Sequence, residues 1–145
     1  MKSASKYCKA INRAQAKVFI TNGNVISITN LEGTQVRSIR SSSRMRRLTA
    51  FDFNNRTGRI YWADRGSQAI YSSFENGSSV IKLAGSGLGL VESLAVDWIG
   101  QNLYWTDYLL QHIEVSKLDG KNRRILLNVS FFCLINEKLY KNSKH

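Results

Sequence analysis

Alternation of apolar and polar residues runs through the chain in short segments, and this pattern predicts β-strands. Five such segments, NVISI, RIYW, AIYSS, NLYW and HIEVSKL, begin at residues 24, 59, 69, 102 and 112. They alternate or are rich in β-branched and aromatic residues, and no stretch keeps a helical period over three turns. The pattern therefore predicts an all-β fold.

The predicted strands recur at a fixed spacing. The tetrapeptide YWAD at 61–64 returns 43 residues later as YWTD at 104–107, and the segments LTAFDF and LAVDW precede the two copies. The pairs Asn76-Gly77 and Asp119-Gly120 are strong hairpin signals, because both central residues of such a turn can take a positive φ. Four short strands in each unit of this length predict a β-propeller blade. A weaker copy, with FITN in place of the tetrapeptide, comes first, so the units lie near 16–47, 48–90 and 91–128.

The aromatic residues of the tetrapeptides, and Trp98 before the second copy, are expected to pack between neighbouring blades, because buried side chains of this size contribute strongly to a core. A platform for stacking sugars or bases is the alternative, and nothing nearby in the sequence favours it. The aspartate that ends each copy can accept backbone hydrogen bonds where a strand ends. The predicted structural motif comprises Tyr61, Trp62, Asp64, Asp97, Trp98, Tyr104, Trp105, Thr106 and Asp107.

The net charge of +11 belongs mainly to the first third of the chain. Its densest part is SSSRMRRL, with Arg44, Arg46 and Arg47. A solvated basic loop is the simpler interpretation, and binding of a polyanion is the alternative. The sequence contains no recognisable nucleic-acid-binding module, so no nucleic-acid partner is expected.

Cysteine and histidine are sparse, which argues against metal and catalytic chemistry. Cys8 and Cys133 lie in no C-x-x-C or Cys/His cluster, so no metal, cofactor or catalytic residue is predicted. The histidines are His112 and the terminal His145. His112 is expected in the turn after the second tetrapeptide, as an exposed or hydrogen-bonded loop residue; the alternative is a pH switch.

The segments SLAVDWIGQN, YWTD and IEVSKLDGKNRRIL resemble the class B repeat of the low-density lipoprotein receptor and its receptor-related relatives. The resemblance implies an incomplete YWTD-type six-bladed β-propeller over residues 16–128, with about two and a half blades of four antiparallel strands. Residues 1–15, around Cys8, resemble the end of the EGF-like module that precedes such propellers, so Cys8 is a possible disulfide remnant. Residues 129–145 lack the pattern and are interpreted as a tail outside the family, with a diverged edge strand as the alternative.

The function implied by the resemblance is that of a non-catalytic fragment of the extracellular propeller of an endocytic receptor. Such a fragment contributes to protein-ligand binding or to ligand release at endosomal pH, and its partners are protein ligands or neighbouring receptor modules. Arg65, Glu92 and Tyr108, near predicted strand ends, are candidates for the ligand face. The alternatives are a Wnt-co-receptor or nidogen-like matrix-binding propeller and a basic polyanion-binding protein. A metal-dependent lactonase is not expected, because Asp52 and Asp97 could not assemble its metal site in so incomplete a ring.

Localisation is predicted for the parent protein rather than for this chain. The sequence has no apolar run long enough to span a membrane and no apolar segment behind its basic start, so it shows neither a transmembrane helix nor a signal peptide. Possible N-glycosylation sites at Asn55, Asn76 and Asn128 suit an extracellular origin. Blades need neighbours to cover their faces, so marginal stability is expected for the chain alone.

Overall fold

The computed structural model describes residues 17–39 and 45–128, and it confirms the predicted all-β fold. The strands of these two ranges form three antiparallel sheets in which neighbours in sequence are neighbours in space. The first sheet has three strands, β1 (Val18–Thr21), β2 (Ile26–Thr29) and β3 (Val36–Ile39).

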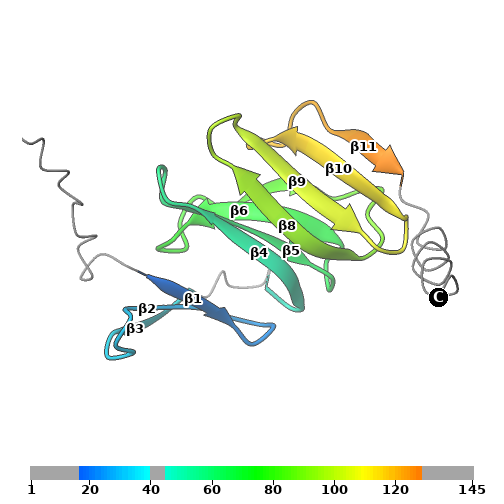
Figure 1. Ribbon diagram of the computed structural model, residues 1–145. Helices are drawn as coiled ribbons and strands as arrows, with labels where there is room; N and C mark the ends of the chain where they lie inside the picture. The colour runs from blue at the N-terminus through cyan, green and yellow to red at the C-terminus, as the bar shows by residue number, and fades with distance from the viewer. Residues whose placement is uncertain (1–16, 40–44, 129–145) are drawn as a thin grey trace, which may run out of the picture.

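The second and third sheets have four strands each and match the two predicted complete blades (Figure 1). The second sheet contains β4 (Leu48–Asn54), β5 (Arg59–Asp64), β6 (Ala69–Phe74) and β7 (Ile81–Ala84). The third sheet contains β8 (Val91–Asp97), β9 (Asn102–Asp107), β10 (His112–Lys117) and β11 (Arg124–Asn128). No helix able to cross a membrane occurs among the described residues.

The turns repeat as closely as the strands do. Left-handed backbone conformations recur at a spacing of 43 residues at the pairs Gly58 and Gln101, Gln68 and Gln111, Gly77 and Gly120, and Ser79 and Asn122. The expectation that both residues of Asn76-Gly77 and Asp119-Gly120 take positive φ is wrong, since only the glycines do. The loop between β6 and β7 is longer than two residues, and the Asn76 side chain accepts the Ser78 amide at 2.9 Å, an arrangement that needs no left-handed asparagine.

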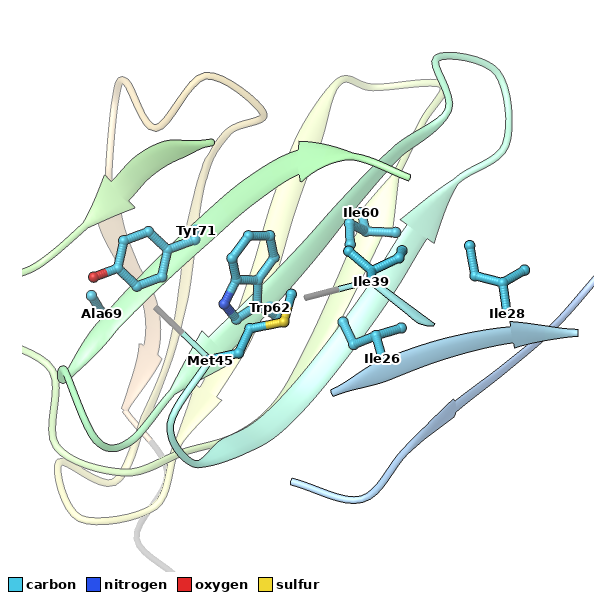
Figure 2. Close-up of a cluster of buried hydrophobic side chains, with 8 residues drawn as sticks. All are labelled: Ile26, Ile28, Ile39, Met45, Ile60, Trp62, Ala69 and Tyr71. Carbon is cyan, nitrogen blue, oxygen red and sulfur yellow. The ribbon is translucent and has the colours of Figure 1, made fainter. Parts of the chain in front are cut away.

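The core between the first and second sheets, called here the first seam, surrounds Trp62 (Figure 2). The indole stacks on the ring of Tyr71, with their centroids 5.6 Å apart. The buried members of the first seam are Ile26, Ile28, Ile39, Met45, Ile60, Trp62, Ala69 and Tyr71.

The core between the second and third sheets, called here the second seam, receives the neighbouring residue of the same tetrapeptide. Consecutive side chains of a strand point to opposite faces, so Tyr61 enters the second seam while Trp62 enters the first. The buried members of the second seam are Tyr61, Ala63, Ile70, Ala84, Val91, Leu94, Leu103 and Trp105. One tetrapeptide therefore joins its sheet to both neighbours.

The inner strands β4 and β8 lie side by side, as in neighbouring blades around a propeller axis (Figure 1). Asp52 of β4 connects them, because its carboxylate accepts the amide of Val96 in β8 at 2.7 Å and that of Phe53 at 2.7 Å. The hydrogen bond between Asp52 and Val96 therefore fixes the position of the third sheet relative to the second.

Candidate functional site

The aspartate of the first tetrapeptide organises the end of the second sheet. The Asp64 carboxylate accepts the amides of Arg46 at 3.1 Å and Arg47 at 2.6 Å through one oxygen, and the amide and hydroxyl of Ser67 at 3.0 and 2.6 Å through the other. Burial acts to raise the pKa of Asp64, but these hydrogen bonds outweigh it and lower the pKa below its ordinary value. The ionised carboxylate thus ties the incoming chain to the turn after β5.

Asp107 does the same for the third sheet. Its oxygens accept the amides of Gly89 at 2.7 Å, Leu90 at 3.0 Å and Leu110 at 3.1 Å. The preceding Thr106 is half-buried, whereas Asp107 is buried. Asp64 and Asp107 therefore make equivalent contacts: each binds the segment that leads into its sheet and the turn that follows its own strand.

The turns fixed by these aspartates carry the predicted ligand-face residues. Arg65 and Tyr108 directly follow Asp64 and Asp107, and their amides donate to the carbonyls of Arg47 and Leu90 at 2.8 Å each. Glu92 is the second residue of β8, whose first residue pairs with Asp107, so it lies at the same end of the sheets. All three residues are exposed.

Two further residues of this end, Leu109 and Leu110, are absent from the predicted face. They follow Tyr108 in the turn, and the exposed fractions of Tyr108, Leu109 and Leu110 are 49%, 62% and 45%. Three consecutive large apolar residues in a polar turn are the sequence signal that could have revealed them. The strand-end face is defined here as Arg65, Glu92, Tyr108, Leu109 and Leu110.

The structure corrects the expected position of His112. The residue is not in a loop: it begins β10, pairs with Asp107 in the ladder and is only 9% exposed. The turn before it is short because Gln111 takes a left-handed conformation and closes it. The imidazole Nε2 lies 3.0 Å from Oε1 of Glu114.

Glu114 is the centre of a buried polar cluster that the sequence analysis did not single out. Arg123 makes a two-pronged contact with it, Nε to Oε2 at 2.5 Å and Nη2 to Oε1 at 2.8 Å, and the indole of Trp105 donates to Oε1 at 3.2 Å. Burial raises the pKa of Glu114, but Arg123, with a smaller contribution from His112, lowers it further, so the net pKa is below the ordinary value.

Arg123 also extends the cluster to the connection between the second and third sheets. Its guanidinium donates to the carbonyls of Ser86 at 2.6 Å and Gly87 at 2.7 Å and lies 5.5 Å from the centroid of the Trp105 ring. The partners of Arg123 come from three separate segments, so no local sequence pattern could have predicted the cluster.

Asp107, His112 and Glu114 each offer one ligand atom within 4.8 Å of the others, which is close enough for one cation. Their lone pairs are already engaged, however: Asp107 holds three backbone amides, and Arg123 balances the charge of Glu114. The arrangement is explained by these contacts and needs no ion.

The predicted motif residues divide into buried and exposed sets. Tyr61, Trp62 and Trp105 are at most 2% exposed, whereas Tyr104 is half-buried. Trp98 is 49% exposed, so its placement in the core between blades is wrong. It follows β8 in a turn that Asp97 holds by accepting the amides of Ile99 and Gly100 at 3.1 and 2.8 Å.

The remaining predicted sites are scattered. The glycosylation candidates are exposed, Asn55 and Asn76 in turns and Asn128 at the end of β11. Asp52 and Asp97 are engaged with backbone amides of different segments. Cys8, Arg44, Cys133 and His145 lie outside the described residues.

Two four-stranded sheets with consecutive strand order, adjacent inner strands and shared aromatic seams define blades of a β-propeller. A chain in a crystal structure of a nidogen/laminin complex has the same fold, with a TM-score of 0.68 over 77% of this chain and 44% of that chain, at 24% identity.

Residues 101–133 match the low-density lipoprotein receptor repeat class B. The chain is 42% identical over 123 residues to low-density lipoprotein receptor-related protein 5 of Mus musculus and 32% identical over 128 residues to low-density lipoprotein receptor-related protein 8 of Gallus gallus. These alignments cover 83% and 86% of this chain but 8% and 14% of the two relatives. The chain belongs to the family of low-density lipoprotein receptor class B repeats and forms part of a YWTD propeller.

Proposed function

We propose that the chain is a non-catalytic part of a receptor propeller and that its strand-end face binds a protein ligand. The observation that carries this proposal is the exposed row Tyr108, Leu109 and Leu110 on a turn that Asp107 holds in place. Aromatic residues and arginine are enriched in protein interfaces, and Arg65 occupies the equivalent turn of the neighbouring sheet. Because the turns are already ordered, binding loses little backbone entropy.

The parent protein is proposed to be a membrane receptor with this propeller on its extracellular face. The support is the similarity to two receptor-related proteins, each many times longer than this chain. The ligand is either another protein or a neighbouring module of the same receptor. A matrix-binding role of the nidogen kind and a Wnt-co-receptor role are the alternatives within the same class.

The test uses two purified probes, laminin and the cysteine-rich ligand-binding repeats of a low-density lipoprotein receptor, against the immobilised chain in surface plasmon resonance. We expect at least one probe to bind and the double variant R65A/Y108A to weaken it at least about tenfold, as for central interface residues. R124A, which removes an exposed charge from the outer strand β11, is the matched control. Failure of both probes to bind, or equal losses in both variants, contradicts the proposal.

Release of ligand at endosomal pH is a second part of the proposal, supported by the buried contact between His112 and Glu114. Protonation of His112 places a second cation beside Glu114, which already pairs with Arg123. The segment that Arg123 holds at Ser86 and Gly87 leads into β8, which carries Glu92 of the strand-end face. We expect H112Q to abolish any increase in the dissociation rate between about pH 7.4 and about pH 5.5; an unchanged increase contradicts it.

Polyanion binding is a second candidate function, favoured by three arginines at one strand end. Arg46 and Arg47 donate their amides to Asp64, and the amide of Arg65 donates to the carbonyl of Arg47, so the segment before β4 and the turn after β5 bring the three residues together. Heparin binding with a steep salt dependence, lost in R47A/R65A, is the expected result. A shallow salt dependence indicates a solvated basic surface instead.

A further inference from the structure

A groove of about 460 Å³ opens between the second and third sheets at the end opposite the strand-end face. Arg59, which begins β5, lines the groove, whereas Arg65 follows the other end of the same strand. The groove is also lined by Tyr61, Ser72, Ile81, Leu118 and Asp119. Its volume falls within the range of about 300–1,000 Å³ that is usual for ligand sites.

The hydroxyl of Tyr61 is one hydrogen-bond donor of the groove. Tyr61 is 2% exposed, and its hydroxyl makes no hydrogen bond within the described part of the chain. Tyr61 lines the groove, and its hydroxyl can donate a hydrogen bond to an acceptor bound there. Burial raises the pKa of Tyr61, which keeps the hydroxyl protonated.

Arg59 supplies the charge. Its Nη2 donates to the hydroxyl of Ser72 and the carbonyl of Ser79, both at 3.0 Å, and the guanidinium lies 4.6 Å from the centroid of the Phe74 ring. Nε and Nη1 have no acceptor, and no ion pair joins Arg59 to a carboxylate, among residues 17–39 and 45–128. Two fixed contacts therefore hold the guanidinium in place while part of it stays available.

The exposed surface of the groove is mostly apolar, which limits the kind of acceptor that fits. Lys117 also lines the groove, but its ammonium donates to the Gly100 carbonyl and to the side chain of Asn102. Ile81 is 46% exposed, and Leu118 packs against the second seam. The one carboxylate in the lining, Asp119, is exposed and pairs with Lys121 at 3.3 Å. A carboxylate on a short apolar stem, such as a glutamate side chain, suits this groove, because Arg59 and Tyr61 can donate to the carboxylate while apolar side chains contact the stem.

The next repeat does not reproduce this donor set. Asn102 stands where the second sheet has Arg59, and its side-chain oxygen accepts the Lys117 ammonium at 3.0 Å. Tyr104 takes the place of Tyr61 and is only half-buried. The groove is thus a particular feature of the second seam rather than a consequence of the repeat.

We propose that this groove, the Arg59 groove, binds a glutamate side chain of an acidic segment of a partner polypeptide. The carboxylate receives hydrogen bonds from Arg59 and Tyr61, and its stem lies against Ile81 and Leu118. The site is independent of the strand-end face, so a ligand at one end of the sheets leaves the other accessible.

The test measures fluorescence polarisation of a fluorescein-labelled peptide of alternating glutamate and glycine added to the full chain. A peptide with glutamine in place of glutamate is the uncharged probe. We expect only the glutamate peptide to bind, with R59Q weakening binding about tenfold and Y61F by several-fold, since charge-assisted hydrogen bonds are the stronger ones.

Two matched variants separate the groove from general charge attraction. R124Q removes the same charge from an exposed strand, and Y104F removes the equivalent hydroxyl of the next repeat, so both are expected to leave binding unchanged. Circular dichroism checks that each variant is folded, and Y61F keeps the test valid if R59Q does not fold. Equal losses for R59Q and R124Q, binding of both peptides, or no binding of either overturns the proposal.

Discussion

The first and second seams place different chemistry at equivalent positions of the same scaffold. Around Trp62 the first seam has Ala69, Tyr71 and Val80, all packed in an apolar cluster. The corresponding residues around Trp105 are His112, Glu114 and Arg123, which form the buried polar cluster. The aromatic residue is common to both seams, whereas its surroundings are not.

This difference shows what the repeat requires. Each seam needs a large buried aromatic ring with closely packed side chains beside it. These side chains can be apolar, or they can be charged groups that pair with one another. The ionic version adds something the apolar version lacks, because Arg123 also holds the carbonyls of Ser86 and Gly87 in the connection between sheets. The polar cluster thus positions a connection as well as filling a core.

Removing the ring should have the largest effect in either seam. We expect W62A to lower the free energy of unfolding by about 3–5 kcal/mol, as for other buried aromatic residues cut to alanine. W98A, which removes the same side chain from an exposed turn, should change it by less than about 0.5 kcal/mol. Urea denaturation followed by circular dichroism measures both, and similar losses for the two variants would contradict the assignment of Trp62 to the seam.

Removing one partner of the polar cluster should cost almost as much. E114A leaves Arg123, whose side chain is 25% exposed, and His112 without their carboxylate, and we expect a loss of about 3 kcal/mol. The same denaturation experiment applies. A loss below about 1 kcal/mol would show that water solvates the Arg123 guanidinium in the absence of the Glu114 carboxylate.

Exchanging the whole cluster tests whether the seams are interchangeable. The triple variant H112A/E114Y/R123V copies the first seam into the second, and its stability should lie within about 1–2 kcal/mol of the parent, because well-packed apolar groups can replace a buried ion pair. We expect it to be more stable than E114A in parallel urea titrations. A triple variant less stable than the single one would mean that the polar cluster is needed for folding.

A fall in pH should lower the stability of the parent chain and of the triple variant H112A/E114Y/R123V to different extents. The pKa of Glu114 is lower in the folded chain than its ordinary value of about 4.3, so its stabilising contribution is present above that value and is lost as the pH falls through the folded pKa. The triple variant lacks this contribution. Between about pH 5 and pH 3 the parent should therefore lose more stability than the triple variant, and thermal melts at each pH measure the difference.

The ion pair beside the first seam should matter least. Lys17 contacts Glu75 at 2.7 Å, but both side chains are partly exposed, so K17A should cost about 0–1 kcal/mol. High salt should reduce that cost further. A loss that is large and independent of salt would show that the pair is effectively buried.

Much of the fold could be predicted because the same pattern of strands and turns occurs in two repeats. The 43-residue spacing located the strands of both complete sheets, and it is obeyed by the left-handed turns at Gln68 and Gln111. Trp98 was misplaced because a tryptophan next to an apolar strand looks the same in sequence whether it ends the strand or follows it. The structure places it after Asp97, outside the ladder.

The site could be predicted only where it depends on position along one strand. Arg65 and Tyr108 follow the repeated aspartates, so their place at a strand end could be read from the sequence. The cluster around Glu114 could not, since Arg123 and Ser86 are brought to it by the packing of different sheets. The Arg59 groove depends likewise on how two sheets meet.

The central claim is that the YWTD residues form the scaffold and the strand ends perform the binding. Its most direct test is the affinity of Y108A for whichever probe, laminin or the ligand-binding repeats, binds the parent chain, measured with unfolding of the same sample. The account predicts an affinity at least about tenfold weaker with the free energy of unfolding within about 0.5 kcal/mol of the parent. An unchanged affinity, or a loss of binding that only accompanies unfolding, would contradict it.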